Sequence, residues 1–129
     1  MTTPLNVLVV EDEAVNRALV RAVLERSGSQ RLRDCVLIEA ESLGEARQCL
    51  LAERFDVVIL DVRLPDGSGL SLARELGQDR SAAGPRVVVM SASVLPSERE
   101  AAMQTGCDAF LAKPFAPTEL TELLVQLTA

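Results

Sequence analysis

Four short segments of this chain carry the side chains that could do chemistry together. An acidic run occupies positions 11–13, Asp61 and Ser91 each end an apolar stretch, and Lys113, the only lysine among 13 cationic side chains, precedes Pro114. Two carboxylates in one pocket repel each other unless a cation lies between them, and a hard, oxygen-binding ion such as Mg²⁺ meets that need. A carboxylate can then act as a nucleophile toward a phosphoryl group, whose oxygens the ammonium and the hydroxyl bind. The set therefore predicts phosphoryl transfer to Asp61.

Each of these residues also has an ordinary structural explanation. The acidic run can cap a helix and complement its dipole. Asp61 can be a turn residue ahead of Pro65, Ser91 a loop hydroxyl and Lys113 a solvated cation. Their joint occurrence at the ends of four predicted strands favours a shared site, because the carboxyl ends of parallel strands meet at one edge of a sheet.

The segments that must position these residues alternate between strand and helix patterns. Short apolar runs predict buried strands at 6–10, 36–40, 57–60, 86–90 and 109–111. Helical spacing of apolar residues follows each of them, at 14–26, from 43, at about 70–76, at 97–105 and from 117. This alternation predicts one α/β domain over residues 1–129: a flavodoxin-like, doubly wound, five-stranded parallel sheet in the order 2-1-3-4-5, with helices on both faces.

Several details of these elements are also expected. The first helix should end at Gly28 and be followed by a polar loop at 29–34. Ser-x-x-Glu pairs predict capping boxes for the helices that begin near 42 and 97, and loops are expected at 65–69 and 82–85. The residues expected to face the core are Val15, Leu19, Ala22 and Val23 in the first helix, Leu43, Ala46 and Leu50 in the second, and Leu120, Leu123, Leu124 and Leu127 in the last.

Composition narrows the classes of function. A net charge of −6 argues against direct binding of nucleic acid, which needs a basic surface. No apolar run approaches the ~20 residues that span a bilayer and no secretion signal is present, so a cytoplasmic protein without membrane insertion is expected. The lack of histidine excludes a Ser-His-Asp triad, imidazole metal ligands and a phosphohistidine on this chain. The three cysteines have no CxxC spacing and are expected to be reduced: Cys35, Cys49 and Cys107.

Four motifs together resemble the receiver domains of bacterial two-component response regulators. They are VLVVEDE at 7–13, DVRLPDGSG at 61–69, VVMSA at 88–92 and DAFLAKPF at 108–115. The resemblance covers essentially the whole chain. It implies that Asp61 is the phospho-acceptor, that Ser91 is the switch hydroxyl and that Lys113 binds the phosphoryl group.

The same resemblance assigns the metal and switch positions. It implies a Mg²⁺ (or Mn²⁺) site formed by Asp12, Asp61 and the backbone carbonyl of Arg63, with Glu11 acting through water. The remaining implied roles are a switch aromatic at Phe110, tuning of phosphoryl lifetime by Arg63 and Ser93, and a cis peptide bond before Pro114. Phenylalanine lacks the hydroxyl of tyrosine, so any switch at Phe110 would be a packing event.

The function implied is that of a signalling domain. A partner histidine kinase or histidine phosphotransfer protein would phosphorylate Asp61 with Mg²⁺ bound, and the face built from the fourth helix, fifth strand and last helix would change shape for a downstream protein partner. The domain would not be an enzyme beyond its own phosphorylation and autodephosphorylation. The initiating methionine favours a stand-alone regulator over a piece of a longer one. The last helix, from Thr118 onward, carries no arginine or lysine, which departs from the charged dimer interface of one large transcription-factor subfamily.

Three other functions are weighed against this one. A degenerate receiver would only bind partners, but the intact set of acidic, hydroxyl and lysine positions argues against it. A phosphatase with an aspartyl nucleophile would carry a second acid two residues after Asp61, where this chain has Arg63. A flavin-binding module would have to bind phosphate at the first strand–helix turn, where the acidic run would repel it.

Overall fold

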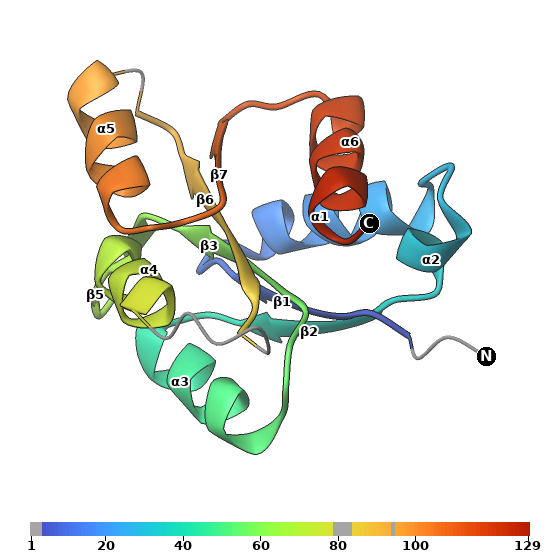
Figure 1. Ribbon diagram of the computed structural model, residues 1–129, viewed down its shortest axis with the longest axis horizontal. Coiled ribbons are helices and arrows are strands. Elements are labelled where there is room, and N and C mark those ends of the chain that lie inside the picture. Colours follow the sequence, from blue (N-terminus) through green and yellow to red (C-terminus); the bar gives the residue numbers. More distant parts are fainter. Residues whose placement is uncertain (1–3, 79–83, 94) are drawn as a thin grey trace.

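The computed structural model describes residues 4–78, 84–93 and 95–129. Its centre is a parallel sheet of five strands in the order β2-β1-β3-β6-β7, which confirms the predicted order (Figure 1). The strands are β1 (Asn6–Val10), β2 (Val36–Ala40), β3 (Val57–Asp61), β6 (Arg86–Ser91) and β7 (Ala109–Ala112). The part of the expected 82–85 loop that falls on 82–83 lies outside the described residues.

The two faces of the sheet carry separate apolar cores because side chains alternate along a strand. Leu8 and Val10 of β1 join a core covered by α3 (Leu43–Ala52), α4 (Gly69–Gln78) and α5 (Pro96–Gln104). Val7 and Val9 join the opposite core, which α1 (Ala14–Glu25), α2 (Gln30–Arg33) and α6 (Pro117–Leu127) cover (Figure 1). Every residue of β3 is buried, as expected of the central strand of a sheet covered on both sides.

The predicted buried face of the first helix is partly wrong. Helix α1 buries Val20, Val23 and Leu24, whereas Val15 is 78% exposed and Leu19 is 45% exposed. Residues 20, 23 and 24 share one helical face at i, i+3, i+4 spacing, and that face meets the sheet. Val15 and Leu19 follow the same spacing on a neighbouring face, which the described residues leave open to solvent.

The chain between α1 and β2 also differs from the prediction. Helix α1 ends one residue before Arg26, and Gly28 is not in the left-handed conformation that favours glycine at a helix end. The expected loop contains α2, whose N-cap is the Ser29 side chain and whose Leu32 is buried. One inward leucine is enough to order a short helical turn that polar composition alone does not predict.

Two further predictions about helix starts and loops are refined. The Ser42 side chain accepts from the backbone N–H of Glu45, as the predicted capping box requires. The box predicted at Ser97 is wrong, since α5 begins at Pro96, a residue suited to the first helical position, and Ser97 lies inside the helix.

The loop expected at 65–69 belongs to a small antiparallel hairpin that begins at Arg63. Its strands are β4 (Arg63–Leu64) and β5 (Gly67–Ser68), and Gly67 adopts a φ of 147°, which only glycine takes without strain. Helix α6 buries Leu120 and Leu124 as predicted. None of the helices in the described ranges has the length and apolar character needed to cross a bilayer.

Candidate functional site

The carboxyl ends of the strands bring the predicted site residues to one edge of the sheet. Glu11 follows β1 directly, Asp61 is the last residue of β3, and Ser91 is the last residue of β6. The register pairs Asp61 with Met90 and places Lys113 just after β7. The sequence prediction that these segments converge is therefore confirmed by their placement.

Lys113 lies between two buried carboxylates. Its Nζ is 2.8 Å from Glu11 Oε2 and 2.8 Å from Asp61 Oδ2. Glu11 is 0% exposed and Asp61 7% exposed, while the Lys113 side chain is 17% exposed. The ammonium thus partly neutralises two acids that are removed from water.

The pKa values of this group follow from burial and pairing. Burial raises the pKa of Glu11 above its usual range, and the hydrogen-bonded Asp61 raises it further, while Lys113 and Asn16 act in the opposite direction. For Lys113, burial alone would lower the pKa, but the hydrogen bonds to Asp61 and Glu11 outweigh burial and raise it. The lysine is a fixed cation at neutral pH.

Three carboxylates at this edge are suited to a divalent cation. Oxygens of Glu11, Asp12 and Asp61 all lie within 4.8 Å of one another, and Asp12 is exposed to solvent. The Arg63 backbone N–H donates to Asp61 Oδ1 at 3.3 Å, which places the start of β4 beside the cluster. Hard oxygen donors in this number fit Mg²⁺, which keeps several waters when it binds proteins.

Residues that the sequence did not single out hold the acidic run in place. Glu11 Oε1 accepts from the Glu13 N–H and from Asn16 Nδ2, both at 3.2 Å. Arg17 donates to the Glu11 carbonyl at 2.8 Å. The capping explanation of the acidic run is wrong, because Glu13 is the N-cap residue of α1 and no side chain of the described residues makes a cap hydrogen bond there. The two oxygens of Glu11 bind different partners: Oε1 accepts from the Glu13 N–H and Asn16, and Oε2 accepts from Lys113.

Gly69 is a second residue that sequence reasoning missed. A Cβ at this position would collide with the backbone carbonyl of Asp61, and the Gly69 N–H donates to the Val62 carbonyl at 2.7 Å. Only glycine lets the start of α4 pass this close to the strand that carries Asp61. The glycines of the segment after Asp61 were the available signal.

Asp66 fixes the hairpin that follows Asp61 to the neighbouring helix. Its two carboxylate oxygens accept from the Leu43 and Gly44 N–H groups at 2.9 and 3.0 Å, at the start of α3. These two backbone hydrogen bonds lower the pKa of Asp66 below its ordinary value of 3.8. The contact holds the loop next to the acidic cluster in one position.

The predicted switch residues lie at the same edge but have partners on α5. Ser91 is 2% exposed; its hydroxyl donates to Glu98 Oε1 at 2.5 Å and accepts from the Ser93 N–H at 3.0 Å. Phe110 packs at the margin of the α3–α5 core, with the Arg99 guanidinium carbon 5.8 Å from its ring centre. The Lys113–Pro114 peptide bond is cis, as predicted.

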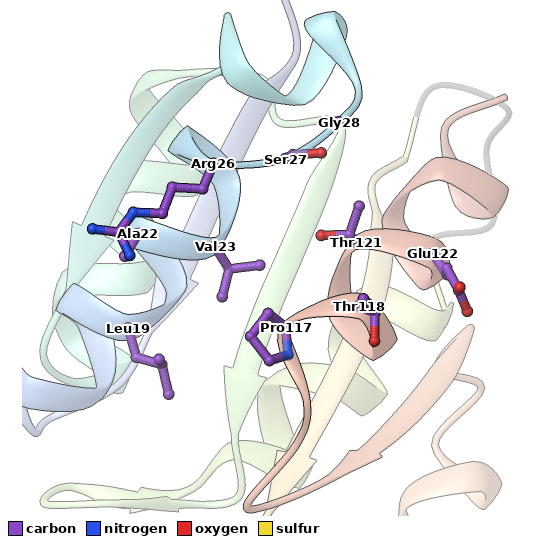
Figure 2. Close-up of a pocket in the computed structure, with 10 residues that line it drawn as sticks. All are labelled: Leu19, Ala22, Val23, Arg26, Ser27, Gly28, Pro117, Thr118, Thr121 and Glu122. Atoms are coloured by element: carbon purple, nitrogen blue, oxygen red, sulfur yellow. The ribbon is translucent and has the colours of Figure 1, made fainter.

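Two grooves lie along α1, and one of them includes Lys113 of the site. One is lined by Asn16, Leu19, Val20, Met90, Ala92, Lys113, Pro114 and Phe115. The other runs between α1 and α6, where Leu19, Ala22 and Val23 lie across from Pro117 and Thr121 (Figure 2). Leu19 lines both grooves, so the exposed side of α1 is continuous with the position of Lys113.

Comparison with known proteins agrees with this geometry. The family model described as the response regulator receiver domain matches residues 7–125. The chain belongs to this family. Receiver domains are the phosphoryl-accepting domains of two-component signal transduction, and the resemblance drawn from the four motifs is confirmed.

Among its relatives are two transcriptional regulators. The KDP operon regulatory protein KdpE of Escherichia coli is 37% identical over 115 residues, which cover 89% of this chain and 47% of that protein. The phosphate regulon regulatory protein PhoB of Pseudomonas aeruginosa is 30% identical, over 92% of this chain and 49% of that protein. The chain thus spans about half the length of the curated relatives it matches.

Solved structures show the same fold. A response regulator from Chloroflexus aurantiacus superposes with a TM-score of 0.84 at 26% identity, covering 98% of both chains. A response regulator from Burkholderia pseudomallei, solved with a phosphorylated aspartic acid and a calcium ion, gives a TM-score of 0.75 at 26% identity, over 97% of this chain and 66% of that one.

Proposed function

We propose that Asp61 is the phospho-acceptor of this receiver domain and that a phosphohistidine on a partner protein is the donor. The observation that carries the proposal is the position of Asp61, a buried carboxylate bonded to the chain's only lysine and within 4.8 Å of two other acids. An Asp61 carboxylate oxygen attacks phosphorus; the new O–P bond forms as the P–N bond breaks, and the electron pair returns to the imidazole nitrogen. The partner would be a histidine kinase or a histidine phosphotransfer protein.

The residues present fit a divalent cation and a phosphoryl group together. Asp12, Asp61 and the Arg63 carbonyl would hold Mg²⁺ or Mn²⁺, with Glu11 acting through water. When bound, the ion neutralises charge on the phosphoryl oxygens. An ammonium has three N–H donors, and Lys113 uses two of them on carboxylates, so the third can donate to a phosphoryl oxygen.

Intact-mass spectrometry after incubation with acetyl phosphate tests the acceptor directly. Wild type should gain one phosphoryl group in a Mg²⁺-dependent manner, and Asp61→Asn should gain none. Asp34→Asn is the matched control, because Asp34 is exposed and lies before β2 at the opposite edge of the sheet. Equal labelling of wild type and Asp61→Asn would overturn the proposal, and no labelling with no Mg²⁺ binding would instead favour a degenerate receiver.

The domain is proposed to regulate and not to turn over substrates. Arg63, exposed beside Asp61, stands where an aspartyl phosphatase would carry its second acid. We therefore expect no sustained hydrolysis of a phosphomonoester. The responding surface is proposed to be α5, β7 and α6, which a downstream protein partner would recognise in the cytoplasm without direct contact with nucleic acid. Ser93 and Arg63 are proposed to set the lifetime of the phosphoryl group.

The phosphohistidine partner is proposed to contact the exposed side of α1. The donor imidazole must reach Asp61 at the carboxyl edge of the sheet, and α1 begins at that edge. Val15 and Leu19 are apolar and exposed there, and Leu19 shares a groove with Lys113. A partner seated on these side chains would bury them while its histidine faces Asp61.

A further inference from the structure

Two consecutive residues of α5 hold both parts of the proposed switch. Glu98 Oε1 accepts the Ser91 hydroxyl at 2.5 Å, and the Arg99 guanidinium lies over the Phe110 ring, 5.8 Å from its centre. A cation within about 6 Å of a ring centre is attracted to the ring face. Ser91 is on β6 and Phe110 is on β7, so the first turns of α5 contact both strands.

Helix α5 makes only a small apolar contact with the rest of the described fold. Its one buried residue is Ala102, and its neighbours are α4 and β7 at the edge of the sheet (Figure 1). A helix with so small an apolar contact depends on polar contacts for its exact position. The Glu98 hydrogen bond and the contact of Arg99 with the Phe110 ring therefore contribute to the position of α5.

The Ser91 hydroxyl cannot serve Glu98 and a phosphoryl group at once. A serine hydroxyl has one proton to donate, and both a carboxylate and a phosphoryl oxygen are acceptors only. Ser91 Oγ already accepts from the Ser93 N–H, so its proton is committed to Glu98 in this conformation. A phosphoryl group on Asp61 would compete with Glu98 for that single proton.

We propose that Glu98 is a positioning residue that stabilises the unphosphorylated conformation by holding Ser91 away from Asp61, and that Arg99 holds Phe110 in the matching position. This proposal rests on the assignment of Asp61 as acceptor and of Ser91 as the residue that follows the phosphoryl group. When Ser91 turns toward Asp61, Glu98 loses its partner. The turn of α5 that carries Arg99 is then free to shift, and the Phe110 ring leaves its present position.

The aromatic content of the chain offers a direct reporter. Phenylalanine occurs at three positions, 55, 110 and 115, and the chain has no tryptophan or tyrosine. Protein labelled with 4-fluorophenylalanine should give three ¹⁹F resonances, and Phe110→Leu assigns the one of interest. Phe55, which is buried in the core, reports whether a variant remains folded.

The decisive variant is Glu98→Ala, with Glu100→Ala as the matched control from the exposed side of the same helix. Glu98→Ala should move the Phe110 resonance toward its position in beryllofluoride-bound wild type before any beryllofluoride is added. It should also raise the affinity for beryllofluoride at saturating Mg²⁺ by about tenfold, because one competing charge-assisted hydrogen bond has been removed. Glu98→Gln, which keeps an acceptor oxygen without the charge, should fall between wild type and Glu98→Ala.

The outcomes separate this inference from the proposed function. If wild type binds beryllofluoride and Glu98→Ala changes neither the Phe110 resonance nor the affinity, Glu98 does not hold the switch and the inference is wrong. The same holds if Glu100→Ala has an equal effect. If wild type does not bind beryllofluoride with Mg²⁺, the acceptor assignment itself fails, and the inference falls with it.

Discussion

Replacing Lys113 with Met should expose the cost of keeping two carboxylates together in this fold. Methionine keeps most of the length of the side chain but removes the ammonium that is 2.8 Å from both Glu11 and Asp61. The two acids, 0% and 7% exposed, then face each other without a counter-ion. Removing one partner from a buried charged pair costs about 3–5 kcal/mol.

Protonation limits that cost. If Glu11 takes up a proton in the variant, the free-energy cost at pH 7 is set by the difference between pH 7 and the ordinary pKa of 4.5 of this carboxyl group. That difference corresponds to about 3.4 kcal/mol, since each pH unit is worth ~1.4 kcal/mol. Partial exposure of Lys113 reduces the effect further, so we expect Lys113→Met to lose about 2–3 kcal/mol of unfolding free energy.

Urea unfolding at pH 7, without and with Mg²⁺, measures this loss. Mg²⁺ should restore part of the stability of Lys113→Met, because an ion that binds only the folded acidic cluster stabilises it by mass action. Arg86→Met is the control: the Arg86 side chain is 59% exposed, so its ion pair with Asp108 should contribute under ~1 kcal/mol. If Lys113→Met unfolds within ~0.5 kcal/mol of wild type in the absence of Mg²⁺, the ammonium does not compensate these carboxylates, and the electrostatic account of the site is refuted.

Three further perturbations test the supporting contacts. Asp66→Ala removes two hydrogen bonds to the start of α3 and should lower the melting temperature at pH 7. Because the pKa of Asp66 in the folded protein lies below 3.8, the difference in melting temperature between wild type and variant should be complete above pH 3.8 and shrink as the pH falls through the folded pKa. Calorimetry showing a difference that widens toward low pH would contradict this. Gly69→Ala introduces a Cβ against the Asp61 carbonyl and should lower both stability and acetyl phosphate labelling, so normal labelling of a fully stable variant would be inconsistent with the close approach. Leu19→Glu should slow phosphotransfer from a phosphohistidine donor about tenfold or more while leaving labelling by acetyl phosphate unchanged. Leu51→Glu, at a leucine 90% exposed on α3, should alter neither, and equal effects of the two would argue against docking on α1.

The convergence of the site was predictable from the sequence for a simple reason. Parallel strands end at one edge, so acids, a hydroxyl and a lysine placed after successive apolar runs must meet there. Asp61 and Lys113 come from segments more than fifty residues apart in the sequence, yet Lys113 Nζ donates a hydrogen bond of 2.8 Å to Asp61 Oδ2. The strand order followed from the same alternation of strands and helices.

The errors have equally physical origins. Val15 and Leu19 have the spacing of a buried helical face, and periodicity does not distinguish a face that meets the sheet from one that is exposed. The short α2 was missed because a single buried leucine in a polar stretch gives no periodic signal. The contacts of Glu98 and Arg99 could not be predicted from the sequence either, because nothing in the sequence of a polar helix indicates which strand residue a charged side chain will contact.

Locating the phosphoryl group on the chain tests the central claim most directly. Borohydride reduces an aspartyl phosphate to homoserine, so protein treated with acetyl phosphate and Mg²⁺ can be reduced, digested and sequenced by mass spectrometry. We expect homoserine at position 61 and at none of the other aspartates. Homoserine at Asp12 or Asp66 in place of Asp61 would contradict the assignment of the acceptor.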